Sequence, residues 1–445
     1  MSRDHHPDTA VQRRTIATLV GSQVLGGVGV ASGVAVGSLL AEDVSGSADL
    51  AGLGGTFQVL GGALIAVPMA RLMARRGRRP GLGLGYLLGI AGAVLLITAG
   101  VVRSFPLLLL GSVLFGGATT SNSQARYAAA DLAEDRHRGR DLSVVVWATT
   151  IGAVLGPNLV GLAGTVADAL HLPALTGAFV FSLAGFVLAA VLISLRLRPD
   201  PLLLSRELAR SAAADAGSDT DAEAPHSSVV RGFRVVRSHP AALLGLVAVA
   251  LGHMTMVSVM VMTPLHMHHG GSTLRLIGLV ISIHILGMYA LSPLVGTAVD
   301  RFGGRPVTMV GSVVLIAATL LAAQAPTGWS AGLAVGLFLL GVGWSCTLVS
   351  GSTLIAGAVP VADRAGAQGA SDLVMGLAAG GGGALAGLVV GTAGYAMLGL
   401  GAAVVAAAIG LTAAFLRDAG PGPRDGGAHA GHTPPTLDPV DSHVR

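Results

Sequence analysis

The chain has 445 residues, of which 52% are hydrophobic and only 11% are charged, and its mean hydropathy is +0.73. This composition leaves too little polar surface to cover a soluble globule of that size, so it indicates a membrane protein. The basic residues are all arginines, and no basic face carries interleaved aromatic residues, which excludes nucleic acid as a partner. The single cysteine, Cys346, excludes an intrachain disulfide and a cysteine-cluster metal site.

Twelve segments are long and apolar enough to span a bilayer as helices, which takes about 20 residues each. In chain order they cover residues 15–40, 50–73, 81–102, 105–130, 142–167, 173–195, 241–265, 274–298, 307–325, 329–355, 364–391 and 394–416. The first segment is too long and too polar-flanked for a secretory signal, so we expect no processing. The sequence therefore predicts an all-α membrane protein with twelve transmembrane helices.

Arginines gather on one side of the predicted membrane. If the N-terminus is cytoplasmic, only Arg103 and Arg275 lie on the outer side, and the remaining arginines of the tails and loops lie inside. This asymmetry follows the positive-inside rule. It predicts a multi-pass protein of the bacterial inner membrane with both termini in the cytoplasm.

The chain divides into two similar halves. Residues 196–240 form a polar, helix-poor stretch that we expect to be a flexible cytoplasmic linker. A shift of 226 residues aligns "ARRGRRP" (74–80) with "DRFGGRP" (300–306). The same shift pairs Gly52 with Gly278, Gly61 with Gly287, Gly156 with Gly382 and Gly161 with Gly387. We predict two pseudo-symmetric six-helix bundles, 15–195 and 241–416, with an N-terminal tail at 1–14 and a disordered tail at 417–445.

The loop "GTAVDRFGGR" carries a recognisable signature. It resembles the G-x-x-x-D-R-x-G-R/G-R loop of the major facilitator superfamily, and the resemblance extends over essentially the whole ordered chain. It implies the fold of that superfamily and a conformational latch at the cytoplasmic helix ends. The latch residues carried over are Gly296, Asp300, Arg301, Gly303 and Arg305.

The equivalent loop of the first half is degenerate. Ala70 and Ala74 stand where the signature has Gly and Asp, while Gly77, Arg78 and Arg79 remain. The missing carboxylate at Ala74 leaves open whether this loop still latches.

The fifth predicted helix contains "GAVLGPNLVG". Its residues Gly152, Gly156, Pro157 and Gly161 resemble the G-x-x-x-G-P-x-x-G-G element of proton-coupled antiporters in this superfamily, although Val160 replaces one glycine. Proline among small residues lets a helix bend against its neighbour. We expect this helix to flex during transport.

The stretch "GHMTMVSVMVMTPLHMHHGG" is rich in soft metal ligands. Met256 and Met260 share a helix face at i, i+4 spacing, and so do His284 and Met288 in the next span. His253 lies one turn before Met256. Thioether and imidazole groups suit Cu(I) better than hard cations, so these residues form a candidate copper path. Four further residues follow Pro264 in a predicted outer loop, where they would collect metal at the mouth: His266, Met267, His268 and His269.

Architecture alone does not demand these ligands. The first-half positions that match Met256, Met260, His284 and Met288 are Val30, Val34, Gln58 and Gly62. The paired M-x-x-x-M and H-x-x-x-M pattern resembles the bacterial copper importers of the CcoA type, which implies copper import along Met256, Met260, His284 and Met288. Methionine in a membrane helix is, however, often only packing filler.

Two functions remain open. The first is a secondary transporter that imports copper by alternating access. The alternative is a proton-coupled transporter or efflux antiporter of a small organic molecule such as a drug, a metabolite or a flavin-like nutrient. There Asp372 would carry the proton, because a lone carboxylate in a span is costly unless it is paired or protonated. No enzyme motif is present, and we expect a monomer without a resident cofactor.

Overall fold

The structure is a computed structural model that describes residues 9–47, 50, 52–215 and 229–416. No strand occurs in these ranges. The first half contains α1 (Thr9–Ser45), α2 (Leu53–Arg76), α3 (Arg78–Val102), α4 (Phe105–Ala130), α5 (Arg138–Ala169) and α6 (Gly177–Arg196). The second half contains α9 (Pro240–His269), α10 (Leu274–Tyr289), α11 (Ser292–Phe302), α12 (Gly304–Ala323), α13 (Ala331–Ala358) and α14 (Arg364–Phe415). The predicted tail at 417–445 lies outside the described residues.

The described helices account for the twelve predicted spans. Nine helices in the described ranges are long and apolar enough to cross a membrane, and the bent α5 is a tenth. One of the nine, α14, is two helices joined at Gly394, whose φ of 84° interrupts the helical backbone. The 26-residue α4, which packs against α2 and α3, completes the set. Another span is broken: α10 ends at Tyr289, and α11 restarts at Ser292 with Pro293 in its first turn.

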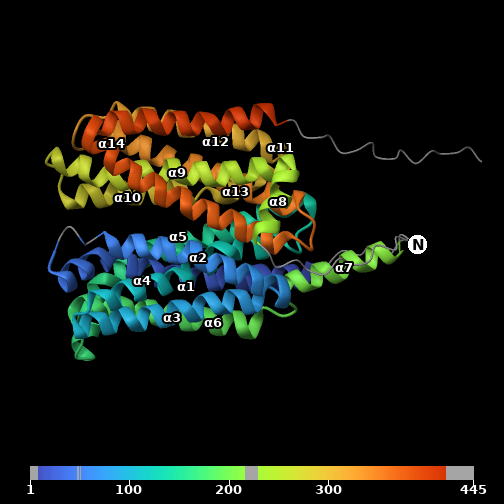
Figure 1. Cartoon of the computed structure of the whole chain (residues 1–445), viewed down its shortest axis with the longest axis horizontal. Coiled ribbons are helices and arrows are strands. Elements are labelled where there is room, and N and C mark those ends of the chain that lie inside the picture. The colour runs from blue at the N-terminus through green and yellow to red at the C-terminus, as the bar shows by residue number, and fades with distance from the viewer. Residues whose placement is uncertain (1–8, 48–49, 51, 216–228, 417–445) are drawn as a thin grey trace, which may run out of the picture.

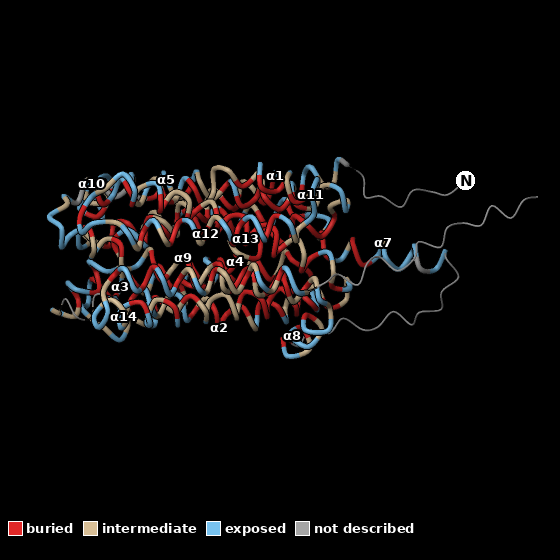
Figure 2. Tube along the Cα trace, turned by 90° about the horizontal axis from the view of Figure 1, so that it is seen from above, coloured by how far each residue is buried: buried red, intermediate tan, exposed pale blue. Residues whose placement is uncertain are grey.

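The two halves form separate bundles that lie side by side along the long axis (Figure 1). Each bundle has its own apolar core. In the first, Phe115 makes edge contacts with Phe179 and Phe186, at ring-centre distances of 6.0 and 5.1 Å. Close helix contacts depend on glycine, because a Cβ at Gly61 would collide with the α4 backbone at Val113. Figure 2 shows buried residues along the interior of the bundles and exposed residues on their outer sides.

The linker is more helical than its composition indicated. It contains α7 (Pro201–Asp215) and α8 (Val229–Ser238). In α8 the buried residues Val229, Gly232 and Val236 follow helical spacing, and Gly232 packs directly on the start of α14. A narrow apolar face against the bundle is therefore enough to order this segment.

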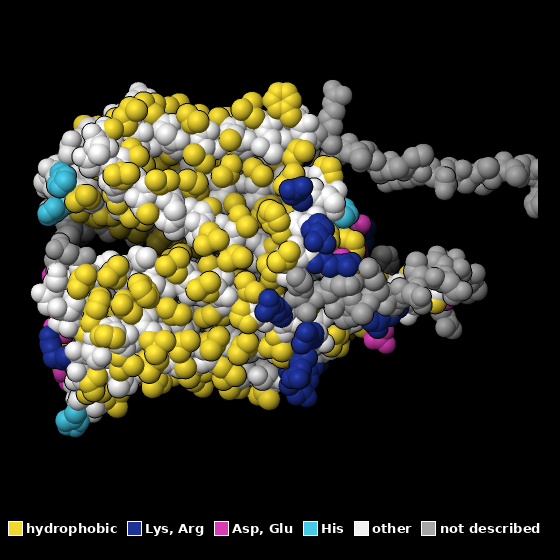
Figure 3. Space-filling model, viewed as in Figure 1, with side chains coloured by type: hydrophobic (Ala, Val, Ile, Leu, Met, Phe, Trp, Pro, Cys, Tyr) yellow, Lys and Arg dark blue, Asp and Glu magenta, His cyan; other side chains and the backbone are white. Residues whose placement is uncertain are grey.

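The halves meet at one end of the molecule and part at the other. We call the end with α7, α8 and the α2–α3 and α11–α12 loops the basic end, because Figure 3 shows its cluster of arginines. There α5 packs on α11 and α2 packs on α14. At the opposite end, which we call the open end, Figure 3 shows a hollow between the two halves. The space between the halves is thus closed at the basic end in this conformation.

Candidate functional site

The intact α11–α12 loop fastens the second half to the first. The carboxylate of Asp300 accepts hydrogen bonds from the backbone N–H groups of Gly139 and Arg140, at 2.7 and 2.8 Å. These groups lie in the first turn of α5, where a helix favours negative charge. Gly296 allows this approach, because a Cβ there would collide with Ser143. Asp300 therefore closes the basic end from the second half.

The other residues of this loop have separate contacts. Gly303 has a φ of 89° and forms the turn into α12. Arg305 donates to the carbonyl oxygens of Ala413 and Ala414 at the end of α14, at 2.6 and 3.0 Å. Arg301 is exposed and lies over the ring of Phe302.

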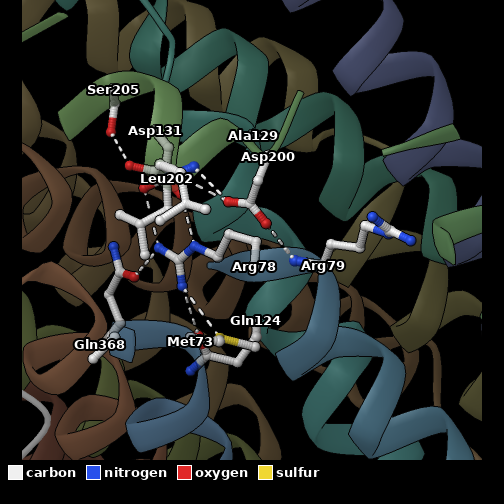
Figure 4. A network of polar contacts seen from close by, with 12 residues as sticks. Met73, Arg78, Arg79, Gln124, Ala129, Asp131, Asp200, Leu202, Ser205 and Gln368 are labelled. Atoms are coloured by element: carbon white, nitrogen blue, oxygen red, sulfur yellow. Dashed lines mark hydrogen bonds and ion pairs between the residues drawn. The ribbon is translucent and has the colours of Figure 1, made fainter. Parts of the chain in front are cut away.

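The degenerate α2–α3 loop has a fully buried ion pair beside it. Arg78 donates to both carboxylate oxygens of Asp131, at 2.7 and 3.0 Å (Figure 4). It also donates to the side-chain oxygens of Gln124 in α4 and Gln368 in α14. Because Gln368 belongs to the second half, Arg78 ties the two halves together.

The linker supplies polar groups next to this loop. Asp200 accepts from the backbone N–H of Arg79 at 2.8 Å, and its carboxylate lies against Gly77, whose φ is 92° (Figure 4). Arg206 of α7 is buried and donates to the carbonyl oxygen of Ala74 at 2.7 Å. Both residues therefore contact the α2–α3 loop, which lacks the signature carboxylate at Ala74.

A second buried ion pair joins α4 to α14. Arg126 Nη2 lies 2.8 Å from Asp372 Oδ1, and Gln124 Nε2 donates to the other carboxylate oxygen of Asp372 at 2.8 Å. Arg126 Nε donates to Ser352 Oγ in α13 at 3.1 Å. Arg126 and Ser352 are 226 residues apart, so residues at equivalent positions of the two halves meet here. We call Arg126, Asp372, Gln124 and Ser352 the central polar cluster.

An aromatic group joins α9, α10 and α13. His253 Nδ1 accepts from Trp344 Nε1 at 2.8 Å, and Tyr289 meets Trp344 edge to face at 5.4 Å. Trp344 is buried, whereas His253 and Tyr289 are half-buried.

The predicted copper ligands make separate contacts in the second half. Met256 and Met288 are buried in the second-half core, and Met260 packs against it. His284 is buried and its Nδ1 lies 2.8 Å from the carbonyl oxygen of Leu337 in α13, while its Nε2 has no hydrogen-bond partner among the described residues. Of the two ligand-bearing helices, α9 packs mainly on α14 and then on α13, whereas α10 packs mainly on α13, and the two make few contacts with each other.

The predicted outer loop is helical instead. Pro264 does not end α9, which continues to His269. Met267 is fully buried in the core, so it is not at the mouth. His266 stacks on Tyr395 at 4.1 Å, and only His268 and His269 are exposed.

The glycines of α5 serve its contact with α1. Gly152 and Gly156 lie so close to α1 that a Cβ would collide with Gly27 and Ala31, whereas Gly161 faces open space. The axis of α5 turns by 66° between Gly156 and Gly161. The side chain of Pro157 lies outside the described part of the structure.

A family model described as Major Facilitator Superfamily matches residues 18–275 and 267–440. The chain belongs to this superfamily. It is 37% identical over 393 residues to the MFS-type transporter YddS of Bacillus subtilis, which covers 88% of each chain. It is also 28% identical over 370 residues to the riboflavin transporter RfnT of Brucella anthropi, covering 83% of this chain and 87% of that one. It is thus a secondary transporter of a bacterial multi-pass type, not an enzyme.

Solved structures of the superfamily share the fold. The human organic anion transporter MFSD10 (TETRAN) matches with a TM-score of 0.71 at 19% identity, over 90% of this chain and 99% of that one. The proton:xylose symporter XylE matches with a TM-score of 0.71 at 16% identity, over 93% and 97%.

Several residues of this superfamily member were not found from its sequence. Arg126 carries a readable signal, because an arginine within an apolar span indicates function. Asp131, Gln368 and Arg206 carry none, since only the fold brings them to Arg78 and Ala74.

Proposed function

We propose that the chain is a proton-coupled transporter of a small organic molecule, working by alternating access across the bacterial cytoplasmic membrane. The observation that carries the proposal is the Arg126–Asp372 pair, which is buried between the halves at the closed end of the path. A buried carboxylate that binds a proton loses its attraction to a neighbouring guanidinium. Protonation of Asp372 therefore weakens a contact that holds the halves together.

The geometry supports a direct coupling. Asp372 belongs to the second half, while Arg126 and Gln124 both belong to α4 of the first half. In the charged state the carboxylate accepts from both, so the closed basic end is favoured. In the neutral state these charge-assisted bonds weaken, and the equilibrium shifts toward opening at the basic end.

The aromatic group supports a planar organic substrate. His253, Tyr289 and Trp344 gather three rings with polar atoms in the second half, which suits a flat heteroaromatic molecule. The similarity to a riboflavin transporter supports a flavin-like molecule within this class. The arginine-rich basic end is then cytoplasmic, in keeping with the positive-inside rule.

The test measures radiolabelled riboflavin transport by the purified chain in liposomes with an imposed proton gradient. We expect gradient-dependent transport that Asp372→Asn uncouples, because the amide cannot exchange a proton. Asp168→Asn, which changes an exposed carboxylate on α5, is the matched control and should behave as wild type. Transport that ignores the gradient, or full coupling in Asp372→Asn, would contradict the proposal.

Copper transport is the second candidate. The observation in its favour is the buried Nε2 of His284, which has no hydrogen-bond partner in the described part of the chain and lies in the half that also buries Met256 and Met288. A soft cation would satisfy such an atom. The organic substrate is preferred because α9 and α10, which carry the candidate ligands, make few contacts with each other.

A further inference from the structure

A polar pocket lies at the seam of the two halves, apart from the transport path. It has a volume of about 330 Å³ at the basic end. The first half lines it with Arg136, His137 and Arg140, and the second half lines it with Thr297, Asp300 and Arg301. A ligand in this pocket would therefore touch both halves at once.

Some charged side chains of the pocket have partners and others do not form ion pairs within the described ranges. Arg136 forms an ion pair with Glu134 at 2.7 Å, and Glu134 also lies 3.5 Å from His137 Nδ1. The carboxylate of Asp300 already accepts two backbone hydrogen bonds from α5. Arg140 and Arg301, one from each half, are exposed and form no ion pair within the described ranges.

We infer that this pocket binds a phosphate group, either a free phosphate anion or the headgroup of an acidic lipid. Two guanidinium groups facing one pocket match the oxygens of a phosphate, which arginine binds through paired hydrogen bonds. Both sources are abundant at the cytoplasmic face of a bacterial membrane. The bound group bridges Arg140 and Arg301 and so adds an inter-half contact next to Asp300.

The consequence is regulation of the conformational equilibrium. The pocket exists only while α5 and α11 are together, so a phosphate group binds the conformation closed at the basic end and stabilises it by mass action. Phosphate thereby holds the path open at the opposite end. This effect does not depend on which substrate the transporter carries.

The experiment follows the width of the open end. Spin labels are placed on cysteines at Glu42 and His269 in a Cys346→Ser background. Both residues are exposed, and they lie at the C-terminal ends of α1 and α9, on opposite halves. One arm titrates inorganic phosphate in detergent at constant ionic strength, with chloride as the comparison anion. The other arm compares phosphatidylglycerol with phosphatidylcholine nanodiscs in phosphate-free buffer.

We expect the population with the longer distance to rise and saturate in at least one arm, and the responding arm identifies the source. Arg140→Gln and Arg301→Gln should each raise the half-saturating concentration about tenfold or more, since each removes a charged donor. Arg75→Gln, an exposed arginine at the same end but outside the pocket, should respond as wild type. The absence of a response in both arms, an equal response to chloride, or an unchanged response in both pocket variants would overturn the inference.

Discussion

The two halves share one backbone plan but hold the basic end together in different ways. Gly77 and Gly303 occupy equivalent turns with φ of 92° and 89°, so the loop conformation is the same in both. In the second half the carboxylate is on the helix itself, as Asp300. In the first half Ala74 lacks it, and the linker residues Asp200 and Arg206 meet the loop instead. Loss of a signature residue is thus compatible with a retained contact, provided another segment reaches the same place.

The largest effect is expected on stability, when the buried ion pair beside the α2–α3 loop is broken. Asp131→Asn leaves the fully buried guanidinium of Arg78 without its counter-charge, and breaking such a pair costs about 3–5 kcal/mol. Thermal unfolding of the purified protein in detergent measures the loss. Arg79→Ala is the control, since only the backbone of Arg79 contacts Asp200. Equal unfolding temperatures for Asp131→Asn and wild type would mean that the pair adds nothing to stability.

The second prediction tests the latch of the second half. Asp300→Asn keeps the shape of the side chain but removes the charge that α5 binds, which weakens charge-assisted bonds worth about 1.5–3 kcal/mol. Substrate transport should fall while the protein still reaches the membrane. Membrane abundance and transport are measured together. Normal transport would remove Asp300 from the mechanism.

The third prediction tests whether the linker stands in for the missing carboxylate. Arg206→Met keeps the buried stem but removes the donor to the Ala74 carbonyl oxygen and, in the second half, to the Ala362 carbonyl oxygen at 3.5 Å. We expect a loss of about 1 kcal/mol from the closed basic end. The same spin-label distance at the open end reports it. Adding Ala74→Asp should restore the wild-type distribution by supplying the carboxylate at the signature position. A double variant no better than Arg206→Met would show that the linker contact has another role.

The sequence predicted the membrane fold well because the signals for it do not depend on knowing which residues touch. Span length, arginine asymmetry and the 226-residue shift can each be read without knowing any contact, and the shift even matches the Arg126–Ser352 hydrogen bond. The polar network was harder to predict. Asp372 was found because a carboxylate in a span is rare, but its partners Gln124 and Arg126 lie about 250 residues away in sequence.

Helix ends and ligand groupings were the weakest predictions for a physical reason. The residues after Pro264 were expected to form an outer loop, because proline removes a backbone hydrogen bond and disfavours a helix interior. Instead α9 continues to His269, and Met267 packs in the core beyond the proline. Spacing at i, i+4 identifies residues on one face of a helix. It does not indicate which neighbour that face meets, and α9 packs mainly on α14 whereas α10 packs mainly on α13.

The smallest expected effect concerns the other difference between the halves, the methionines and histidine of α9 and α10. Met260→Leu with Met288→Leu keeps apolar bulk and removes both sulfur atoms, so packing should change by less than about 1.5 kcal/mol. If the substrate is organic, the double variant transports it as wild type does, and radioactive copper accumulation in cells is the same with either protein. His284→Gln, which installs the residue found at the equivalent Gln58, extends the test to the buried imidazole. Copper accumulation that depends on the protein and falls in both variants would instead assign the second half a soft-metal path, because leucine replaces the volume of methionine but not its thioether.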